Sequence, residues 1–186
     1  MNKILVFLFL ILGFSNSASA ATAKAIIEGA SENSELIGIV RFQDTDEGLR
    51  AEVNMFGAEP GLHGIHIHET GSCAEGGKAA GGHFNPENVK HGFVPTEGLT
   101  QAHAGDFGNI EINESGEGAL LLMIPGLTIT GGKYNVEGKS VILHEEKDDF
   151  GQPTGNAGGR VGCGIIQVDA DDPTTSLERT RLNKRE

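Results

Sequence analysis

Histidine carries most of the potential chemistry in this sequence, and all seven histidines lie between positions 63 and 144. His66 and His68 are separated by a single residue. If they lie on a strand, both imidazoles point to one face while Ile65 and Ile67 point into the core. Alone, such a pair is as compatible with a polar surface as with a metal site. Because imidazole is the commonest side-chain metal ligand, the remaining histidines decide between the two.

A second group of potential ligands lies inside or next to the segment 69–104. Three imidazoles and one carboxylate form a closed tetrahedral set, which is typical of a structural zinc site. Such a site would also hold in place a segment that is unusually long for a loop. The candidate zinc ligands are His83, His91, His103 and Asp106.

A copper site is predicted beside the zinc site. Copper accepts imidazole nitrogens in tetragonal geometry, so His66 and His68 would suit it if further imidazoles join them. His144 ends the apolar run 141–143 and is well placed to be one of these.

The only two cysteines, Cys73 and Cys163, are predicted to form a disulfide. An even pair in an exported protein favours a bridge. The alternative, a pair of metal thiolates, would require more cysteines nearby, and the sequence has none. In the chain-entropy model, a bridge that closes so long a loop stabilises the fold by about 4–5 kcal/mol.

Export is indicated by the first 20 residues. Lys3 precedes the apolar run 4–14, and Ala18-Ser19-Ala20 resembles a signal-peptidase site. The run is too short to span a bilayer, which requires about 20 residues in a helix. We therefore expect residues 1–20 to be a signal peptide and the mature chain to begin at Ala21, with enough residues left for one domain.

The composition favours a single acidic all-β domain. Glycine is abundant, with 28 residues, and tryptophan is absent. Together with short apolar runs, this is typical of a β-domain rich in tight turns. Removal of Lys3 with the leader changes the net charge from −12 to −13. A surface this acidic argues against nucleic acid and anionic membranes as partners.

Short apolar or alternating segments between turn signals predict the strands that must position the ligands. Ala51, Val53 and Met55, for example, share one face of such a segment. The polar segment 145–161 is expected to form a second long loop. Residues 169–186 mix both charges without an apolar period, which predicts a mobile tail. The predicted strands are 24–28, 36–44, 49–56, 62–68, 109–112, 119–124, 140–144 and 163–168.

Four runs of this sequence resemble the copper/zinc superoxide dismutase family in composition, spacing and order. The resemblance covers about residues 23–168, nearly the whole mature chain. It implies an all-β domain over 21–168, an eight-stranded Greek-key β-barrel or sandwich with a long metal-binding loop and a second active-site loop. The runs are GLHGIHIHE at 61–69, GHFNP at 82–86, HAGD at 103–106 and GNAGGRVGCG at 155–164.

The resemblance implies a role for each potential ligand. His83 corresponds to the imidazolate that is shared between one copper ion and one zinc ion in each subunit. His63 corresponds to a position that supports the site through the backbone and binds no metal. Asp148 corresponds to the carboxylate that links a copper-binding histidine to a zinc-binding one. The implied copper ligands are His66, His68, His83 and His144, and the implied zinc ligands are His83, His91, His103 and Asp106.

The resemblance also implies a reaction. Superoxide would be converted to dioxygen and hydrogen peroxide by alternate reduction and oxidation of copper, with Arg160 guiding the anion and His83 supplying a proton. Cys73 and Cys163 correspond to the family's intrachain disulfide. The expected partner is the superoxide anion, with neither nucleic acid nor a membrane, and the subunit could be a monomer or a homodimer.

The sequence departs from the eukaryotic members of the family in its second loop. The segment 145–160 is short, and Pro153 stands where a steering lysine often precedes the Thr-Gly-Asn run. Lys78 or Lys90 could supply long-range guidance instead. The short spacer before Cys73 is closer to bacterial forms, so we expect an exported enzyme of the bacterial type in the periplasm, with secretion as the alternative.

Two other functions fit parts of the pattern. A non-catalytic metal-binding or copper-carrying domain on the same scaffold would typically lack copper ligands or the guiding arginine, all of which are present here. A blue-copper electron carrier would need a cysteine thiolate at copper, whereas a disulfide explains both cysteines better.

Overall fold

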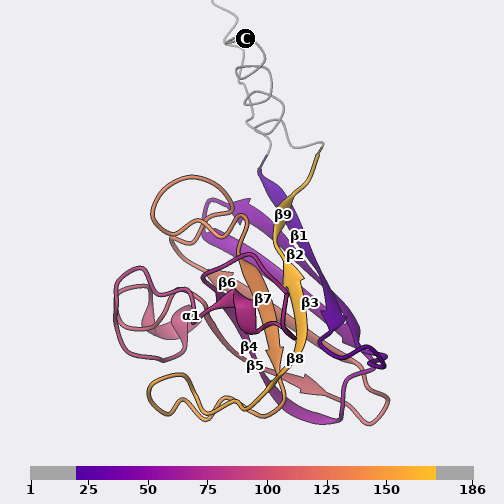
Figure 1. Ribbon diagram of the computed structural model, residues 1–186. Coiled ribbons are helices and arrows are strands. Elements are labelled where there is room, and N and C mark those ends of the chain that lie inside the picture. The colour runs from indigo at the N-terminus through magenta and orange to yellow at the C-terminus, as the bar shows by residue number, and fades with distance from the viewer. Residues whose placement is uncertain (1–19, 171–186) are drawn as a thin grey trace, which may run out of the picture.

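The computed structural model describes residues 20–170, so most of the predicted signal peptide and of the predicted tail lies outside the described residues. This part of the chain is almost entirely β-structure (Figure 1). Its two helical segments are a 3₁₀ turn, Lys78–Ala80, and α1, Val94–Glu97. Neither is long and apolar enough to cross a membrane. The strands are β1 Thr22–Gly29, β2 Ile37–Thr45, β3 Gly48–Phe56, β4 Gly61–His68, β5 Asp106–Ile112, β6 Gly118–Ile124, β7 Ser140–His144, β8 Arg160–Ile165 and β9 Gln167–Val168.

Every segment predicted as a strand is a strand, with two differences. The predicted strand 163–168 is divided into β8 and β9, because buried Ile166 leaves the ladder to exchange backbone hydrogen bonds with the 138–139 turn. β5 begins at Asp106, earlier than predicted. Asp106 and Phe107 are both buried, and Gly108, with φ of +79°, interrupts the alternation of the strand, so the sequence pattern does not reveal these first residues.

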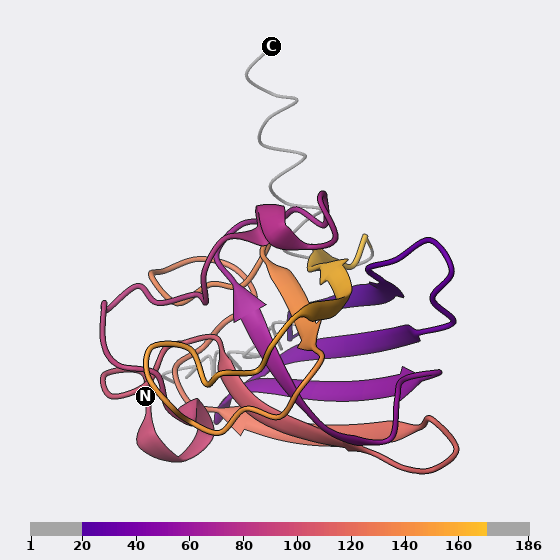
Figure 2. The ribbon, with the colours of Figure 1, turned by 60° about the horizontal axis from the view of Figure 1, so that its bottom comes forward.

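The strands form one antiparallel sheet that curls into a nearly closed barrel (Figures 1 and 2). Its order is β5-β4-β7-β8-β1-β2-β3-β6, and β9 pairs with β1. The two edges, β5 and β6, are consecutive strands joined by a tight turn, so they meet and leave little exposed edge. β4 pairs with β7 rather than with β3, and β6 pairs with β3 rather than with β7. These two crossing connections confirm the predicted Greek-key arrangement.

Most strands follow the alternation of a sheet with one buried face. Ala51, Val53 and Met55 are fully buried on the inner face of β3, as predicted, while the residues between them are partly exposed. β4 and β7 differ, because β7 is buried at every position and β4 from His63 onward. The outer face of these two strands must therefore be covered by other parts of the chain.

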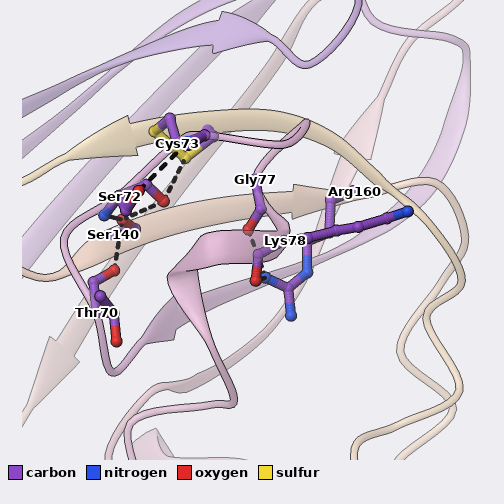
Figure 3. Close-up of a disulfide and its surroundings, with 9 residues drawn as sticks. Thr70, Ser72, Cys73, Gly77, Lys78, Ser140 and Arg160 are labelled. Carbon is purple, nitrogen blue, oxygen red and sulfur yellow. Dashed lines mark hydrogen bonds between the residues drawn. A yellow bond between two sulfur atoms is a disulfide. The ribbon is translucent and has the colours of Figure 1, made fainter.

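Two long connections cover that face. The segments 69–105 and 145–159 lie on the same side of the barrel in both views (Figures 1 and 2). The first is tied to β8 by the predicted disulfide between Cys73 and Cys163. It is also tied to β7, because Ser140 Oγ donates to the carbonyl of Thr70 (2.8 Å) and accepts from the amide of Ser72 (3.0 Å) (Figure 3).

The disulfide should account for a large part of the stability of the metal-free protein. We expect replacement of both Cys73 and Cys163 by Ser to lower the free energy of unfolding by about 4 kcal/mol, because the unfolded chain regains the freedom of a long loop. Urea unfolding of the metal-free proteins measures this. Reduced and alkylated wild type should behave like the double variant, and a loss below about 1 kcal/mol in both proteins would contradict the expectation.

Candidate metal centre

Three histidines meet on the outer face of β4 and β7. His66 and His68 are buried on this face of β4, whereas Ile65 and Ile67 belong to the barrel core, as the alternation predicts. Antiparallel pairing of β4 with β7 brings His144 alongside them. His68 Nε2 and His144 Nε2 are only 3.3 Å apart. Two ring nitrogens at this distance direct their lone pairs toward a common point.

His83 reaches the same point because the first long loop turns back along β4. The amide of Phe84 donates to the carbonyl of Ile67 over 2.8 Å, and His83 forms a bridge with His68. Gly105 then packs across both segments, donating to Phe84 O and accepting from Ile67 N. A Cβ atom at Gly105 would lie 2.1 Å from the carbonyl oxygen of Ile67, so this close approach requires glycine.

The side chains form two donor sets that share one residue. In each set the potential ligand atoms all lie within 4.8 Å of one another, and every contributing residue is buried. His83 belongs to both sets, since one ring nitrogen can face each side. The first set is His66, His68, His83 and His144, and the second is His83, His91, His103 and Asp106.

Among the described residues, three buried ring nitrogens lack a hydrogen-bond partner, Nδ1 of His66, His91 and His144, and the first two bear on whether these sets fit cations. His66 uses Nε2 to contact Asp148, and its Nδ1 is buried without a hydrogen-bond partner. His91 Nδ1 lies 2.9 Å from Asp106 Oδ2, yet the angles do not allow a hydrogen bond. Buried polar atoms in folded proteins almost always have a partner. Nitrogens left unpaired toward a shared centre are what metal ligation requires, so copper and zinc fit the residues present.

Asp106 is the carboxylate around which the second set is built. Its Oδ1 lies 2.9 Å from His83 Nδ1 and 3.1 Å from His103 Nδ1. Its Oδ2 accepts from the backbone amides of Gly92 (2.9 Å) and His103 (3.0 Å). Burial on its own would raise the pKa of Asp106, but hydrogen bonds from the surrounding histidines hold that pKa well below its usual range. The group is therefore a carboxylate at neutral pH.

Asp148 connects the two sets. Its Oδ2 lies 2.9 Å from His66 Nε2, and both of its oxygens lie 2.9 Å from His91 Nε2. Although burial opposes ionisation, hydrogen bonds from His66 and His91 lower its pKa. A carboxylate on the far nitrogen of a ligating histidine fixes the ring and its tautomer, so the near nitrogens of both rings point to the metal positions.

Burial keeps three histidines of the first set neutral. Desolvation is the main reason why the pKa falls to about 4 for His83, about 3 for His144 and about 2 for His68. Their nitrogens are therefore unprotonated and available as ligands at neutral pH. His91 behaves differently, because desolvation is outweighed by Asp106 and Asp148, which raise its pKa to about 9.

Arg160 borders the first set at the start of β8. Its guanidinium donates to the carbonyl of Gly77 (2.5 Å; Figure 3) and to that of Gly81 (2.6 Å), both in the first loop. A cavity of about 200 Å³ opens beside it. The cavity is lined by Arg160 and by three histidines of the first set, His68, His83 and His144, together with residues 154–158 of the second loop. A small anion could thus meet both a fixed positive charge and the ligand cluster.

His63 is buried but belongs to neither donor set. Its Nδ1 lies 2.8 Å from the carbonyl of His144, and its Nε2 lies 2.8 Å from the carbonyl of Glu59. It therefore links β4 to the end of β7 behind the ligands. A larger groove of about 870 Å³ adjoins His63 and the outer side of Arg160, but it contains no member of either donor set.

Three residues that support the site carry no signal in the sequence. Asn109 pairs with the backbone of Asp148, accepting from its N–H (2.7 Å) and donating to its carbonyl (2.9 Å). Phe150 stacks against His91 with ring centroids 6.3 Å apart, and Gln152 binds the backbone of His91. These polar and aromatic residues follow no motif, because their role depends on which loop lies opposite them.

Comparisons with known proteins agree with this geometry. A family model described as copper/zinc superoxide dismutase matches residues 36–166. The extracellular copper/zinc superoxide dismutase of Haemonchus contortus is 38% identical over 139 residues, covering 71% of this chain and 74% of that protein. The corresponding protein of Caenorhabditis elegans is 38% identical over 171 residues, covering 84% and 76%. The crystal structure of the clock protein EA4 is similar at 32% identity and a TM-score of 0.72, covering 86% of this chain and 100% of that one.

The metal-free protein should lose stability as the pH falls from 6.5 toward 4. Over this range an unfolded histidine takes up a proton near pH 6.5, whereas folded His68, His83 and His144 stay neutral until lower pH. The unfolded state then binds more protons, and each of the three removes up to about 1.4 kcal/mol of stability per pH unit. Urea unfolding of metal-free protein across this range measures the slope, and constant stability down to pH 4.5 would show that these rings are not held neutral.

Proposed function

Because the chain belongs to the copper/zinc superoxide dismutase family, we propose that it converts superoxide to dioxygen and hydrogen peroxide at the two donor sets described above. The family uses one copper and one zinc ion, and the chemistry of the two sets suits these metals. An all-imidazole set suits copper, and three imidazoles with one carboxylate suit zinc. The observation that carries the proposal is that one buried histidine, His83, belongs to both sets.

We assign each metal its residues from this arrangement. Copper would be held by the all-histidine set, and zinc by the set that contains Asp106. Asp148 would couple the two sites through His66 and His91, and His63 would brace the end of β7 without binding metal. The copper ligands are His66, His68, His83 and His144, and the zinc ligands are His83, His91, His103 and Asp106.

When bound, copper supplies the one-electron couple that both half-reactions need, and zinc supplies a fixed charge on the other side of His83. The chain's part is to admit and orient the anion. Arg160, held in place by two loop carbonyls, presents its charge to the small cavity beside the copper-binding histidines.

His83 is the residue suited to deliver a proton to the product. Its Nδ1 faces Asp106, which leaves Nε2 toward the cavity side. Because His83 lines the cavity that the anion would enter, a proton held at its Nε2 would lie beside the product. His83 and Arg160 are therefore the proposed catalytic residues, one for the proton and one for the anion.

The local charge can attract an anion although the chain is acidic overall. With two divalent ions present, the carboxylates of Asp106 and Asp148 and an imidazolate at His83 leave about +1 in the pocket before Arg160 is counted. Distant surface charges are screened over roughly 8–10 Å at physiological salt. The net charge of −12 of the whole chain therefore matters less at the mouth of the cavity than the charges that line it.

We further propose that the protein is exported, with residues 1–20 as the signal peptide, 21–168 as the enzyme domain and 169–186 as the tail. The Cys73–Cys163 disulfide supports an oxidising compartment, and the two relatives named above are extracellular enzymes. The periplasm of a bacterium is the proposed location, from the leader and the short spacer before Cys73. Dimerisation is left to measurement, for example by sedimentation.

The metal-loaded full chain should consume superoxide, and His144→Ala should abolish turnover, because it removes a copper ligand. Arg160→Ala should lower kcat/KM by about 10-fold or more, since a positive residue in a cleft raises the encounter rate of an anion by at least that factor. Pulse radiolysis measures both. Arg41→Ala, which removes an exposed charge on β2, is the matched control and should leave the rate within about twofold.

Two outcomes would count against the proposal. Wild type that binds both metals but does not consume superoxide would indicate a metal-binding or metal-carrying protein on this scaffold. An Arg160→Ala variant as fast as the Arg41→Ala control would remove Arg160 from the reaction.

The rate should depend less on ionic strength than in eukaryotic members of the family, because the short second loop carries Pro153 in place of a steering lysine. We expect kcat/KM to fall by less than about threefold between 0.01 and 0.15 M salt. Lys78 lines the same groove as Arg160, and its carbonyl accepts from the guanidinium (3.4 Å). Lys78→Ala should therefore remove most of the remaining dependence, whereas Lys90→Ala should change it little. A steep decline of the wild-type rate with added salt would refute the expectation.

A further inference from the structure

Gln152 lies in the second loop, and its side-chain amide pairs with the backbone of His91. Its Oε1 accepts from the N–H of His91 (3.1 Å), and its Nε2 donates to the carbonyl of His91 (2.8 Å). A primary amide can satisfy both polar groups of one residue in this way, as a neighbouring strand does in a sheet. The backbone of His91 is thereby held at two points.

His91 depends on such support because it lies outside regular structure. Residues 88–93 form neither helix nor strand. The next two backbone amides are also bound by side chains, Gly92 N by Asp106 Oδ2 (2.9 Å) and Phe93 N by a Glu97 carboxylate oxygen (2.7 Å). The position of this stretch is therefore set by individual side chains instead of a hydrogen-bonded ladder.

The second loop contacts His91 with every other residue from 148 to 152. Asp148 binds the ring at Nε2, Phe150 stacks on the ring with an interplanar angle of 19°, and Gln152 binds the backbone. Asp148 fixes the direction of the ring, but a ring can keep that contact while its backbone shifts. Gln152 restrains the backbone of His91, from which the ring extends.

We propose that Gln152 is a positioning residue for zinc, holding His91 so that its Nδ1 stays in the second donor set. This inference rests on the proposed function, in which His91 is a zinc ligand. Loss of the amide would release the backbone of His91 at both points, while His66, His68 and His144 stay in place because β4 and β7 carry them. The effect should therefore fall on zinc and spare copper.

Gln152→Met tests this, because methionine keeps the length of the side chain and removes both hydrogen bonds. We expect the zinc dissociation constant of the full chain to rise about 10- to 100-fold, the range found when a residue that orients a metal ligand is lost. The copper dissociation constant should change less than about threefold. Competition with chromophoric chelators measures both constants. Gln43→Met, on the exposed side of β2, is the matched control.

The Gln152→Glu variant distinguishes a positioning role of Gln152 from an effect of negative charge on zinc binding. Its carboxylate can still accept from the N–H of His91 but cannot donate to the carbonyl, which it would repel. If Gln152 acts through its two hydrogen bonds, Gln152→Glu binds zinc nearly as poorly as Gln152→Met. If only negative charge near the cation matters, Gln152→Glu binds zinc as tightly as wild type or more tightly, and the proposal is wrong.

A spectroscopic measurement reports on geometry independently of activity. Cobalt(II) bound in place of zinc gives visible absorption that depends on its ligands, and the Gln152→Met spectrum should differ from that of wild type and of Gln43→Met. A zinc dissociation constant within about twofold of wild type, with an unchanged cobalt spectrum, would overturn the inference. Should Gln152→Met fail to fold, Gln152→Asn, whose amide is one methylene shorter, carries the same expectation.

Different results would contradict the proposed function and the role of Gln152. If wild type and all variants bind no zinc, the proposed function is wrong. If wild type binds zinc, His91→Ala loses it and Gln152→Met retains it, only the role of Gln152 is wrong.

Discussion

The structure depends on burying two carboxylates among six imidazoles. A buried carboxylate is costly unless it is paired and hydrogen-bonded, and Asp106 and Asp148 obtain their partners from histidine rings and from backbone amides. Burial in turn keeps several of those histidines neutral, so their nitrogens are free to bind cations. The same desolvation that makes the cluster expensive in the metal-free protein makes it a strong ligand set. Metal binding and folding are thus coupled through one group of side chains.

The barrel and the loops contribute differently to this cluster. β4 and β7 supply His66, His68 and His144 from paired strands, where the ladder fixes each position. Of the proposed zinc ligands, Asp106 begins β5, whereas His83, His91 and His103 come from the first loop, where side chains largely replace the ladder. Asn109 holds the second loop at Asp148, and Gln152 holds the first loop at His91. In the proposed function, the redox metal would therefore be held mainly by paired strands, and the structural metal would help to order the first loop.

The hydrogen bonds of Arg160 both fasten the first loop to β8 and hold the guanidinium in place. Arg160 lies three residues before Cys163, and it donates to carbonyls in the segment that follows Cys73. The disulfide and the arginine therefore fasten the same stretch of loop to β8. These hydrogen bonds leave the positive charge of the guanidinium unchanged, and a guanidinium offers five N–H donors, so others remain for the anion. The side chain that faces the anion is consequently held rigid before the anion arrives.

The sequence by itself determined the strands and the ligand types. Period-two alternation is a local property, so all the predicted strands are present, and His66 and His68 share a face because they lie two apart on β4. The family resemblance, carried by motifs around the histidines, extended this to the ligand sets. What only the tertiary structure decided is how loops far apart in the chain meet. The contacts of Asn109, Phe150 and Gln152 follow no periodicity, because each depends on the residue opposite it and not on its own neighbours.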